Sequence, residues 1–267
     1  MTEQTAPVIF EAKGGVGIVS LNQPEKRNSF TDEMLYDLLE KLEQAASDPE
    51  IRVIVLTGNG KSFSVGGDLD EFAAGEFKTV DIPHETSVSK LRNFMRVSQY
   101  LRTSEKVTIA AINGACAGAG LSVAAACDLR FASTKSVFRT AFIDAGLSGD
   151  FGGTWSLVRL LGEARAKELY LLNQKLTPED ALRIGLVSWV ESHETFMPRV
   201  LAEAEALAAK PPIAMKLIKK NLTEEHANFL EALEVEADRH VFCGYTDDAV
   251  EAAAAFLEKR EPNYTGK

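Results

Sequence analysis

The sequence predicts an α/β protein whose C-terminal third is helical, and two observations support this. Buried β-branched runs alternate with segments whose apolar residues recur at helical spacing, an alternation typical of layered α/β proteins rather than of bundles. From Gly152 onward the pattern becomes mostly helical. The chain shows no internal repeat or low-complexity linker, and its 267 residues lie near the upper size of one hydrophobic core.

The predicted strands come mainly from the first half of the chain. Residues 8–12 and 16–21 flank Lys13-Gly-Gly and are predicted to form a β-hairpin. Later apolar runs predict buried or short strands at 51–58, 107–112, 129–132 and 187–190.

Capping residues and apolar spacing mark the predicted helices. Thr31 is expected to cap the first helix, whose buried stripe is Met34, Leu35, Leu38, Leu39 and Leu42. Thr177, followed by Pro178 and acidic residues, predicts another helix start. The other expected helices are 119–127, 194–209, 212–222, 226–242 and 246–259. Residues 75–95 have the least pattern and are predicted to be a mobile surface segment.

Composition narrows the classes of partner. There are 39 acidic and 29 basic residues, so the net charge of −10 repels phosphate backbones and anionic lipid, and neither nucleic acid nor membrane is an expected partner. The uncharged stretch 107–127 is interrupted by Asn113 and three glycines, which argues against a membrane span.

The N-terminus lacks the pattern of a signal peptide. Three cysteines, Cys116, Cys127 and Cys243, build no disulfide framework, so we expect a cytoplasmic protein.

Two glycine clusters stand at predicted strand-to-helix junctions. They are Phe63-Ser-Val-Gly-Gly-Asp-Leu and Asn113-Gly-Ala-Cys-Ala-Gly-Ala-Gly-Leu. Amides at a helix N-terminus have no internal partner, and two that converge form an oxyanion hole. Tight turns are the alternative explanation for these glycines.

Other common site motifs are absent from the sequence. A dinucleotide fingerprint in the second cluster would need a third glycine where Val123 stands. There is no phosphate-binding loop and no nucleophile elbow. The four histidines lack ligand spacing, so we expect no metal site.

Several separated motifs, in order along almost the whole chain, resemble the crotonase (enoyl-CoA hydratase/isomerase) superfamily. They are Leu21-Asn-Gln-Pro-Glu-Lys-Arg-Asn-Ser-Phe, the 63–69 cluster, Ala111-Ile-Asn-Gly, Cys127-Asp, Gly152-Gly-Thr and Ala181-Leu-Arg-Ile-Gly-Leu-Val. The resemblance implies a crotonase-like spiral of ββα units over residues 1–200. Residues 201–267 would form a C-terminal helical trimerisation region that also closes the CoA site. It further implies an acyl-CoA thioester substrate, no separate cofactor because coenzyme A is part of that substrate, and self-association as a trimer or a dimer of trimers.

The resemblance also assigns site residues. The family's two oxyanion-hole amides fall on Gly67 and Ala119. The residues that the resemblance assigns to CoA binding are Lys26, Arg27, Ser64, Gly66, Asp68 and Leu69. A basic residue near the C-terminus would also help to bind CoA. The alternative for Lys26 and Arg27 is that they simply form a solvated turn.

Matching by spacing places Ser122 and Phe142 where hydratases of the family carry two water-binding glutamates. Neither side chain is a base that works unaided, so two-glutamate hydration is disfavoured. Asp150, in Gly149-Asp-Phe-Gly-Gly-Thr-Trp, is the carboxylate expected to act as acid and base. Family members that use an Asp here include dienoyl-CoA isomerases, 4-chlorobenzoyl-CoA dehalogenase and ring-1,2-epoxyphenylacetyl-CoA isomerase, and this chain is most similar to the last.

The environment of Asp150 stays open at the level of sequence. Apolar neighbours such as Phe142, Leu147 and Phe151 would raise the pKa of its carboxyl, whereas the following helix N-terminus would lower it. Asp150 could also be only a helix cap. Asp144 could face inward or face solvent, and Asp128 is expected to hold a turn.

We therefore expect an acyl-CoA isomerase that shifts a double bond or opens a strained ring through a thioester enolate, with Phe151 lining the substrate site. One alternative is a hydratase that works through Asp150, Ser122 and a water. Another is a non-catalytic acyl-CoA-binding homologue. Nucleophilic dehalogenation is weakened because the dehalogenase's histidine would align near Met95, where no histidine stands.

Overall fold

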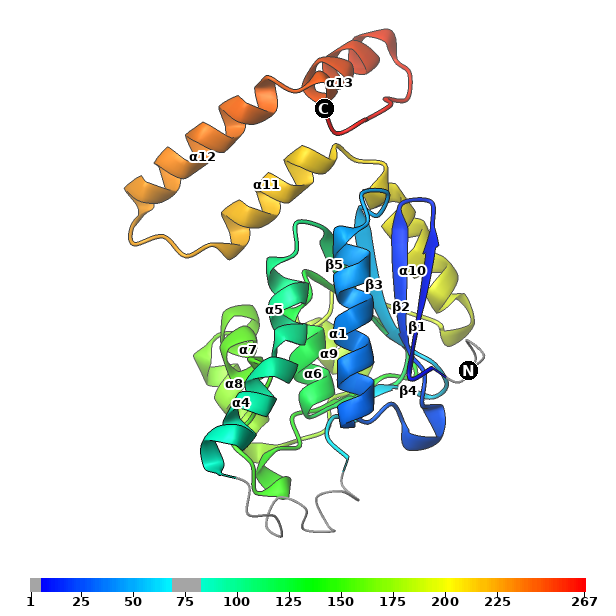
Figure 1. Ribbon diagram of the computed structural model, residues 1–267, viewed down its shortest axis with the longest axis vertical. Helices are drawn as coiled ribbons and strands as arrows, with labels where there is room; N and C mark the ends of the chain where they lie inside the picture. Colours follow the sequence, from blue (N-terminus) through cyan, green and yellow to red (C-terminus); the bar gives the residue numbers. More distant parts are fainter. Residues whose placement is uncertain (1–5, 69–82) are drawn as a thin grey trace.

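Two β-sheets with helices packed around them form the body of the molecule, and a helical arm projects from it (Figure 1). The structure is a computed structural model that describes residues 6–68 and 83–267. None of the helices in these two ranges is long and apolar enough to span a membrane.

The larger sheet has six strands in the order β1-β2-β3-β5-β7-β9, and only the β1–β2 hairpin is antiparallel. Its strands are Val8–Lys13, Val16–Leu21, Val53–Gly58, Val107–Ile112, Leu129–Ser133 and Trp189–Glu191. The smaller sheet joins β4 (Ser62–Ser64), β6 (Ala115–Ala117) and β8 (Val137–Arg139) in parallel. Each successive pair, β3–β4, β5–β6 and β7–β8, thus gives one strand to each sheet before the chain enters a helix.

The helices follow those strand pairs and then form the C-terminal part. They are α1 (Asp32–Ser47), α4 (His84–Phe94), α5 (Arg96–Thr103), α6 (Ala119–Ala126), α7 (Gly153–Leu161), α8 (Glu163–Leu172), α9 (Pro178–Arg183), α10 (His193–Ala208), α11 (Pro212–Thr223), α12 (Phe229–Gly244) and α13 (Asp247–Glu258). The predicted caps are confirmed: Thr31 accepts a hydrogen bond from Met34 N–H, and Thr177 forms a capping box with Asp180.

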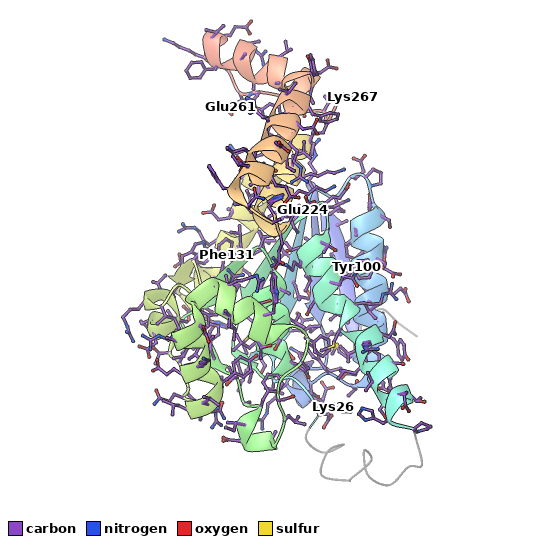
Figure 2. The ribbon with its side chains drawn as sticks, turned by 90° about the vertical axis from the view of Figure 1, so that its left-hand side faces the viewer. Lys26, Tyr100, Phe131, Glu224, Glu261 and Lys267 are labelled. Atoms are coloured by element: carbon purple, nitrogen blue, oxygen red, sulfur yellow. The ribbon has the colours of Figure 1, made fainter. Side chains whose placement is uncertain are left out.

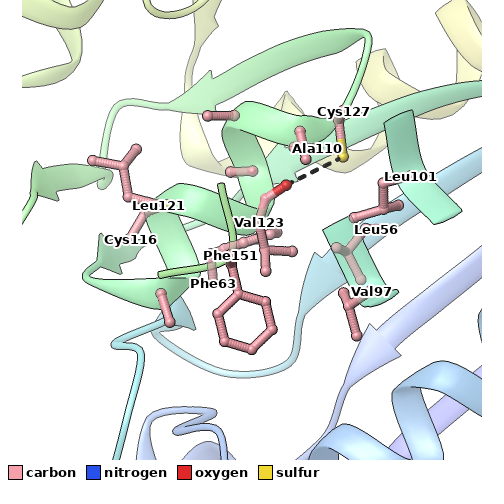
Figure 3. Packing of buried hydrophobic residues seen from close by; sticks show 14 of the residues in the cluster. Leu56, Phe63, Val97, Leu101, Ala110, Cys116, Leu121, Val123, Cys127 and Phe151 are labelled. Carbon is pink, nitrogen blue, oxygen red and sulfur yellow. Dashed lines mark hydrogen bonds between the residues drawn. The ribbon is translucent and has the colours of Figure 1, made fainter. Parts of the chain in front are cut away.

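Both faces of the larger sheet are buried. Alternate residues of a strand point to opposite faces, so each strand contributes side chains to two cores. Val53 and Val55 belong to the core under α10, whereas Ile54 and Leu56 face the core under α1, α5 and α6. The predicted stripe of α1 is fully confirmed, since all five of its residues are buried. Figure 3 shows Leu56 and Val123 in this second core, close to Phe151.

The prediction of a mobile segment over residues 75–95 is wrong for the part that the structure describes. Residues 84–94 form α4, and α5 follows at once. Phe94 is buried and packs edge-on against Tyr36 of α1, with ring centroids 5.0 Å apart. Phe94 is the one buried residue of α4, so the local pattern was too sparse to indicate a helix. Residues 75–82 lie outside the described residues.

Helices α11, α12 and α13 form the arm, and a buried lysine attaches its base to the body (Figures 1 and 2). Lys219 Nζ lies 2.8 Å from Asp128 Oδ2 and donates to the carbonyls of Leu101 and Lys106. Asp128 also accepts hydrogen bonds from Thr108, so it holds a turn as predicted. Burial lowers the pKa of the Lys219 ammonium, while the charge of Asp128 opposes that shift.

Removing the Lys219 ammonium should destabilise the protein. Lys219→Ala leaves the partly buried Asp128 carboxylate without its opposite charge and removes a donor from two carbonyls, so we expect a loss of about 2–4 kcal/mol of unfolding free energy. Lys220→Ala, one residue on, removes a half-exposed lysine that pairs with the exposed Glu105 and should cost less than about 1 kcal/mol. Denaturant unfolding measures both, and equal losses would contradict this account.

Candidate active site

The two glycine clusters meet in the fold, and Gly66 makes their approach possible. Its φ is +85°, and a Cβ at this position would lie 2.8 Å from Ala119 N and 2.9 Å from Ala117 O. Ser64 holds the turn, because its fully buried hydroxyl accepts a hydrogen bond from Gly66 N–H. Only glycine therefore allows the 63–68 loop to lie directly on the start of α6.

Neither expected oxyanion-hole amide is used in the backbone hydrogen bond beside it. Phe30 N–H donates to Gly66 O at 2.7 Å, and in a trans peptide the N–H lies opposite the carbonyl, so Gly67 N–H points away from Phe30. Ala119 is the first residue of α6, ahead of the helical hydrogen bond from Ser122 N–H to Gly118 O. Two donors at adjoining chain segments can stabilise a negative oxygen.

Helices α6, α7 and α8 come together at Gly153, the first residue of α7. A Cβ here would lie 2.1 Å from Ser122 Oγ and 2.6 Å from the Tyr170 hydroxyl. The Tyr170 ring stacks on Phe142, with centroids 5.9 Å apart and planes 10° apart. The fold thus brings Ser122 and Phe142, the positions expected to match the two absent glutamates, to the same side chain, Tyr170.

Asp150 stands in the turn that leads into α7 and is positioned by two glycines. Gly149, with φ of +112°, lies against the Tyr170 ring, and Gly153 N–H donates to the Asp150 carbonyl at 3.0 Å. Phe151 adopts φ of +47° and is buried against Phe30, with ring centroids 5.7 Å apart. The positive φ of Phe151 stores backbone strain, which is typical of functional turns.

The Asp150 carboxyl is half-buried, and one of its two oxygens is buried without a partner. Its Oδ1 is inaccessible and has no hydrogen-bond partner among the described residues. Burial raises the pKa of Asp150 to about 6. The helix-cap alternative is wrong, because Gly152 is the N-cap of α7 and no side chain caps it. Leu147 does not contribute to this burial as expected, since its side chain is exposed.

Sequence reasoning missed Tyr170. Its hydroxyl is buried without a hydrogen bond of good geometry to any described residue, although Ser122 lies beside it. Burial raises the pKa of Tyr170 to about 12, the hydrogen-bonding interaction with Ser122 opposes that shift, and the negative charge of Asp150 adds to it. The sequence Glu168-Leu-Tyr-Leu-Leu does not reveal which of its apolar side chains face the protein interior. Leu169 is buried, whereas the equally apolar Leu171 and Leu172 are exposed.

Lys26, the first of the residues expected to bind CoA, lies at the end of the body away from the arm (Figure 2). Lys26 is the last residue of the 3₁₀ helix Pro24–Lys26 and Arg27 follows it, and both are exposed. The buried Asn28 holds this turn, accepting from Gln23 N–H and donating to Ser62 O. Asp68 is half-buried and accepts from Ser29 Oγ at 3.3 Å. Leu69 lies outside the described residues.

Other reactive groups contribute little to this site. Asp144 is exposed and pairs with Arg139 at 2.5 Å, so it faces solvent. Cys116 and Cys127 are free and buried, and burial raises the pKa of the Cys127 thiol to about 12. Within residues 6–68 and 83–267, no group of three or more His, Cys, Asp or Glu side chains could hold a metal ion.

The sequence profile of the enoyl-CoA hydratase/isomerase family matches residues 11–267. The chain belongs to this family. It is 36% identical to the 1,2-epoxyphenylacetyl-CoA isomerase of Escherichia coli K12 over 97% of this chain and 98% of the relative. It is 33% identical to a short-chain-enoyl-CoA hydratase of Clostridium acetobutylicum over 95% of both chains. A solved enoyl-CoA hydratase structure from Polaromonas sp. JS666 is 34% identical and superposes with a TM-score of 0.89, covering 97% of this chain and 99% of that one. The predicted crotonase-like spiral of ββα units is thereby confirmed.

Gly153 should tolerate no side chain. Gly153→Ala puts a methyl group into Ser122 Oγ and the Tyr170 hydroxyl, so α7 must shift, and we expect about 1–3 kcal/mol of destabilisation. Gly244→Ala is the matched control, since it lies near a helix end with nothing within 4 Å and should be neutral or stabilising. Thermal unfolding compares the two. Equal behaviour of both variants would refute the close approach of α6, α7 and α8.

Neutralising Asp150 should stabilise the protein in a pH-dependent way. A raised folded-state pKa means that the ionised carboxylate is penalised in the fold above pH 6, and that this penalty disappears as the pH falls from about 6 to about 4. Asp150→Asn should therefore be more stable than the parent by up to about 3 kcal/mol at pH 8. The two proteins should be equally stable near pH 4. Denaturant unfolding across this range would contradict the assignment if the difference were absent or constant.

Proposed function

We propose that this chain is an acyl-CoA isomerase in which Asp150 moves a proton between carbons of the acyl group. The observation that carries the proposal is the half-buried Asp150 carboxyl, whose Oδ1 has no partner among the described residues and whose pKa of about 6 suits proton transfer near neutral pH. The 36% identity to an isomerase over nearly the whole chain supports the same reaction class. Coenzyme A is part of the substrate in this proposal, and no separate cofactor takes part.

The proposed reaction needs one base and one pair of donors. The Asp150 carboxylate takes a proton from one carbon, and the electron pair of that C–H bond moves into the thioester, which becomes an enolate. Gly67 N–H and Ala119 N–H stabilise the negative oxygen, by roughly 3–4 kcal/mol per donor. The protonated Asp150 returns its proton to another carbon, the double bond moves, and the composition of the substrate is unchanged.

Hydration is the second candidate function, and the identity to hydratases favours it. It would need a water beside Asp150. The Ser122 hydroxyl is buried and donates to Gly118 O at 3.4 Å, so it is a weaker choice for positioning that water than a carboxylate. The unpartnered polar atoms of the site support catalysis over mere binding of acyl-CoA.

Self-association belongs to this proposal as well. The arm exposes large apolar side chains that a single chain leaves uncovered, among them Leu222, Phe229, Leu230, Phe256 and Leu257. Exposed apolar groups of this density favour a protein interface. Figure 2 shows Lys26 at the far end of the body and Lys267 on the arm, so the two lie at opposite ends of the molecule. A basic residue of the arm would therefore have to reach the CoA site of another subunit. The three free cysteines support a cytoplasmic location.

Replacing Asp150 should abolish turnover while sparing binding. Asp150→Asn removes the proton carrier, so exchange of substrate α and γ protons with heavy water should fall by at least about 10³-fold, with acyl-CoA affinity changed less than about threefold. Asp144→Asn, six residues upstream, is the matched control and should keep parental activity because Asp144 faces solvent. Full activity of Asp150→Asn would reject the proposal.

The pH profile should report the same carboxyl. As the base, Asp150 is active when ionised, so kcat/KM should fall about tenfold per pH unit below its pKa of about 6. Initial rates from pH 4.5 to 8 measure this limb. A profile that stays flat down to pH 4.5 would contradict the assignment.

A further inference from the structure

The end of α8 is closed by an asparagine at a position where glycine is the usual residue. Asn173 follows the helix with φ of +50°, and its N–H donates to Leu169 O at 3.2 Å. Glycine adopts this left-handed conformation without strain. The Asn173 side chain is buried, and its Nδ2 has no hydrogen-bond partner among the described residues. A buried donor without a partner is unfavourable, so closing α8 does not by itself explain an asparagine here.

The Asn173 side chain instead supports the turn that precedes Phe142. Its Oδ1 accepts a hydrogen bond from Ala141 N–H at 2.7 Å. The neighbouring Thr140 hydroxyl is buried and donates to Leu169 O at 2.7 Å. Two hydrogen bonds thus fasten this turn to the last turn of α8.

The turn is strained and therefore needs this support. Ala141 has φ of +63°, and Phe142 N–H donates to Thr140 O at 2.8 Å, which closes a three-residue γ-turn. Turns of this kind with a positive φ at their centre are rare, and any residue other than glycine is strained there. Without the Asn173 oxygen, Ala141 N–H would lose its acceptor and the turn would be free to relax.

Phe142 connects this turn to the site. Its ring stacks on Tyr170, with centroids 5.9 Å apart. Tyr170 in turn lies against the chain that carries Asp150, since a Cβ on Gly149 would lie 3.4 Å from Tyr170 Cε1. Leu147 N–H, three residues before Asp150, donates to Phe142 O at 2.9 Å. A displaced Phe142 would therefore loosen the aromatic wall beside Asp150 and let water approach its carboxyl.

We propose that Asn173 is a positioning residue of the site, whose amide oxygen holds the strained turn at Ala141 and thereby fixes the Phe142 ring. The fixed ring, stacked on Tyr170, limits the access of water to Asp150. This inference rests on the proposed function only in taking Asp150 as the reacting carboxyl. Burial is the cause of the raised pKa of Asp150, and the neighbouring Tyr170 is uncharged below its own pKa of about 12. Loss of burial should therefore lower the pKa of Asp150.

A ¹³C NMR titration of the aspartate carboxyls tests this proposal, with Asp150 assigned by the resonance that Asp150→Asn lacks. Asn173→Gly keeps the left-handed backbone and removes only the side chain. It should lower the titration midpoint of Asp150 from about 6 by about one pH unit, toward the ordinary value of an aspartate. Gln174→Gly, at the exposed next residue, is the matched control and should leave the midpoint unchanged. Under the proposed function, the acid limb of the kcat/KM profile shifts with the midpoint.

Ala141→Gly is the rescue, because glycine adopts the positive φ of this turn without strain. Combined with Asn173→Gly, it should restore most of the parental midpoint. An unchanged midpoint in Asn173→Gly, an equal fall in Gln174→Gly, or a double variant without recovery would overturn the role of Asn173. Should Asn173→Gly fail to fold, a folded double variant supports this role, and failure of both overturns it. Full activity of Asp150→Asn would reject the proposed function alone and leave this titration unaffected.

Discussion

The close approach of α6 to the chain on both sides is the constraint on which the site depends. On one side Gly120 and Gly66 let the helix lie against β4 and its loop, where a Cβ on Gly120 would come within 2.5 Å of Ser64 O. On the other side Gly153 lets α7 and Tyr170 contact Ser122. Because side chains are absent at these contacts, backbone amides and buried polar groups from three segments share one small volume.

That constraint explains why a single carboxylate is sufficient for the proposed chemistry. Asp150 belongs to a turn that contains several glycines and the buried Phe151. Burial in this turn, rather than a charged neighbour, raises the pKa of Asp150. The same burial leaves the Tyr170 hydroxyl without a partner among the described residues. The protein therefore keeps buried polar groups that its own side chains do not fully compensate, an arrangement that costs stability and is typical of active sites.

Local patterns predicted much of the fold. The cap at Thr31, the α1 stripe and the glycine clusters after β3 and β5 depend on neighbours in sequence, so each of them is predictable from the order of residues alone. The helices over 84–103 were missed because their anchors, such as Phe94, are held by α1 and not by a local pattern. The three-residue strands of the smaller sheet were too short to recognise. Tyr170 and the direction of the Asp150 pKa shift depend on how α6, α7 and α8 cross, which no local pattern encodes.

The most direct test of the central claim is a crystal structure with a bound acyl-CoA analogue. The account predicts the thioester oxygen within about 2.7–3.1 Å of both Gly67 N and Ala119 N, the distance range of oxyanion-hole donors. It also predicts that the Asp150 carboxyl contacts the carbons next to the thioester. A thioester oxygen bound elsewhere, or an Asp150 turned away from those carbons, would contradict the account.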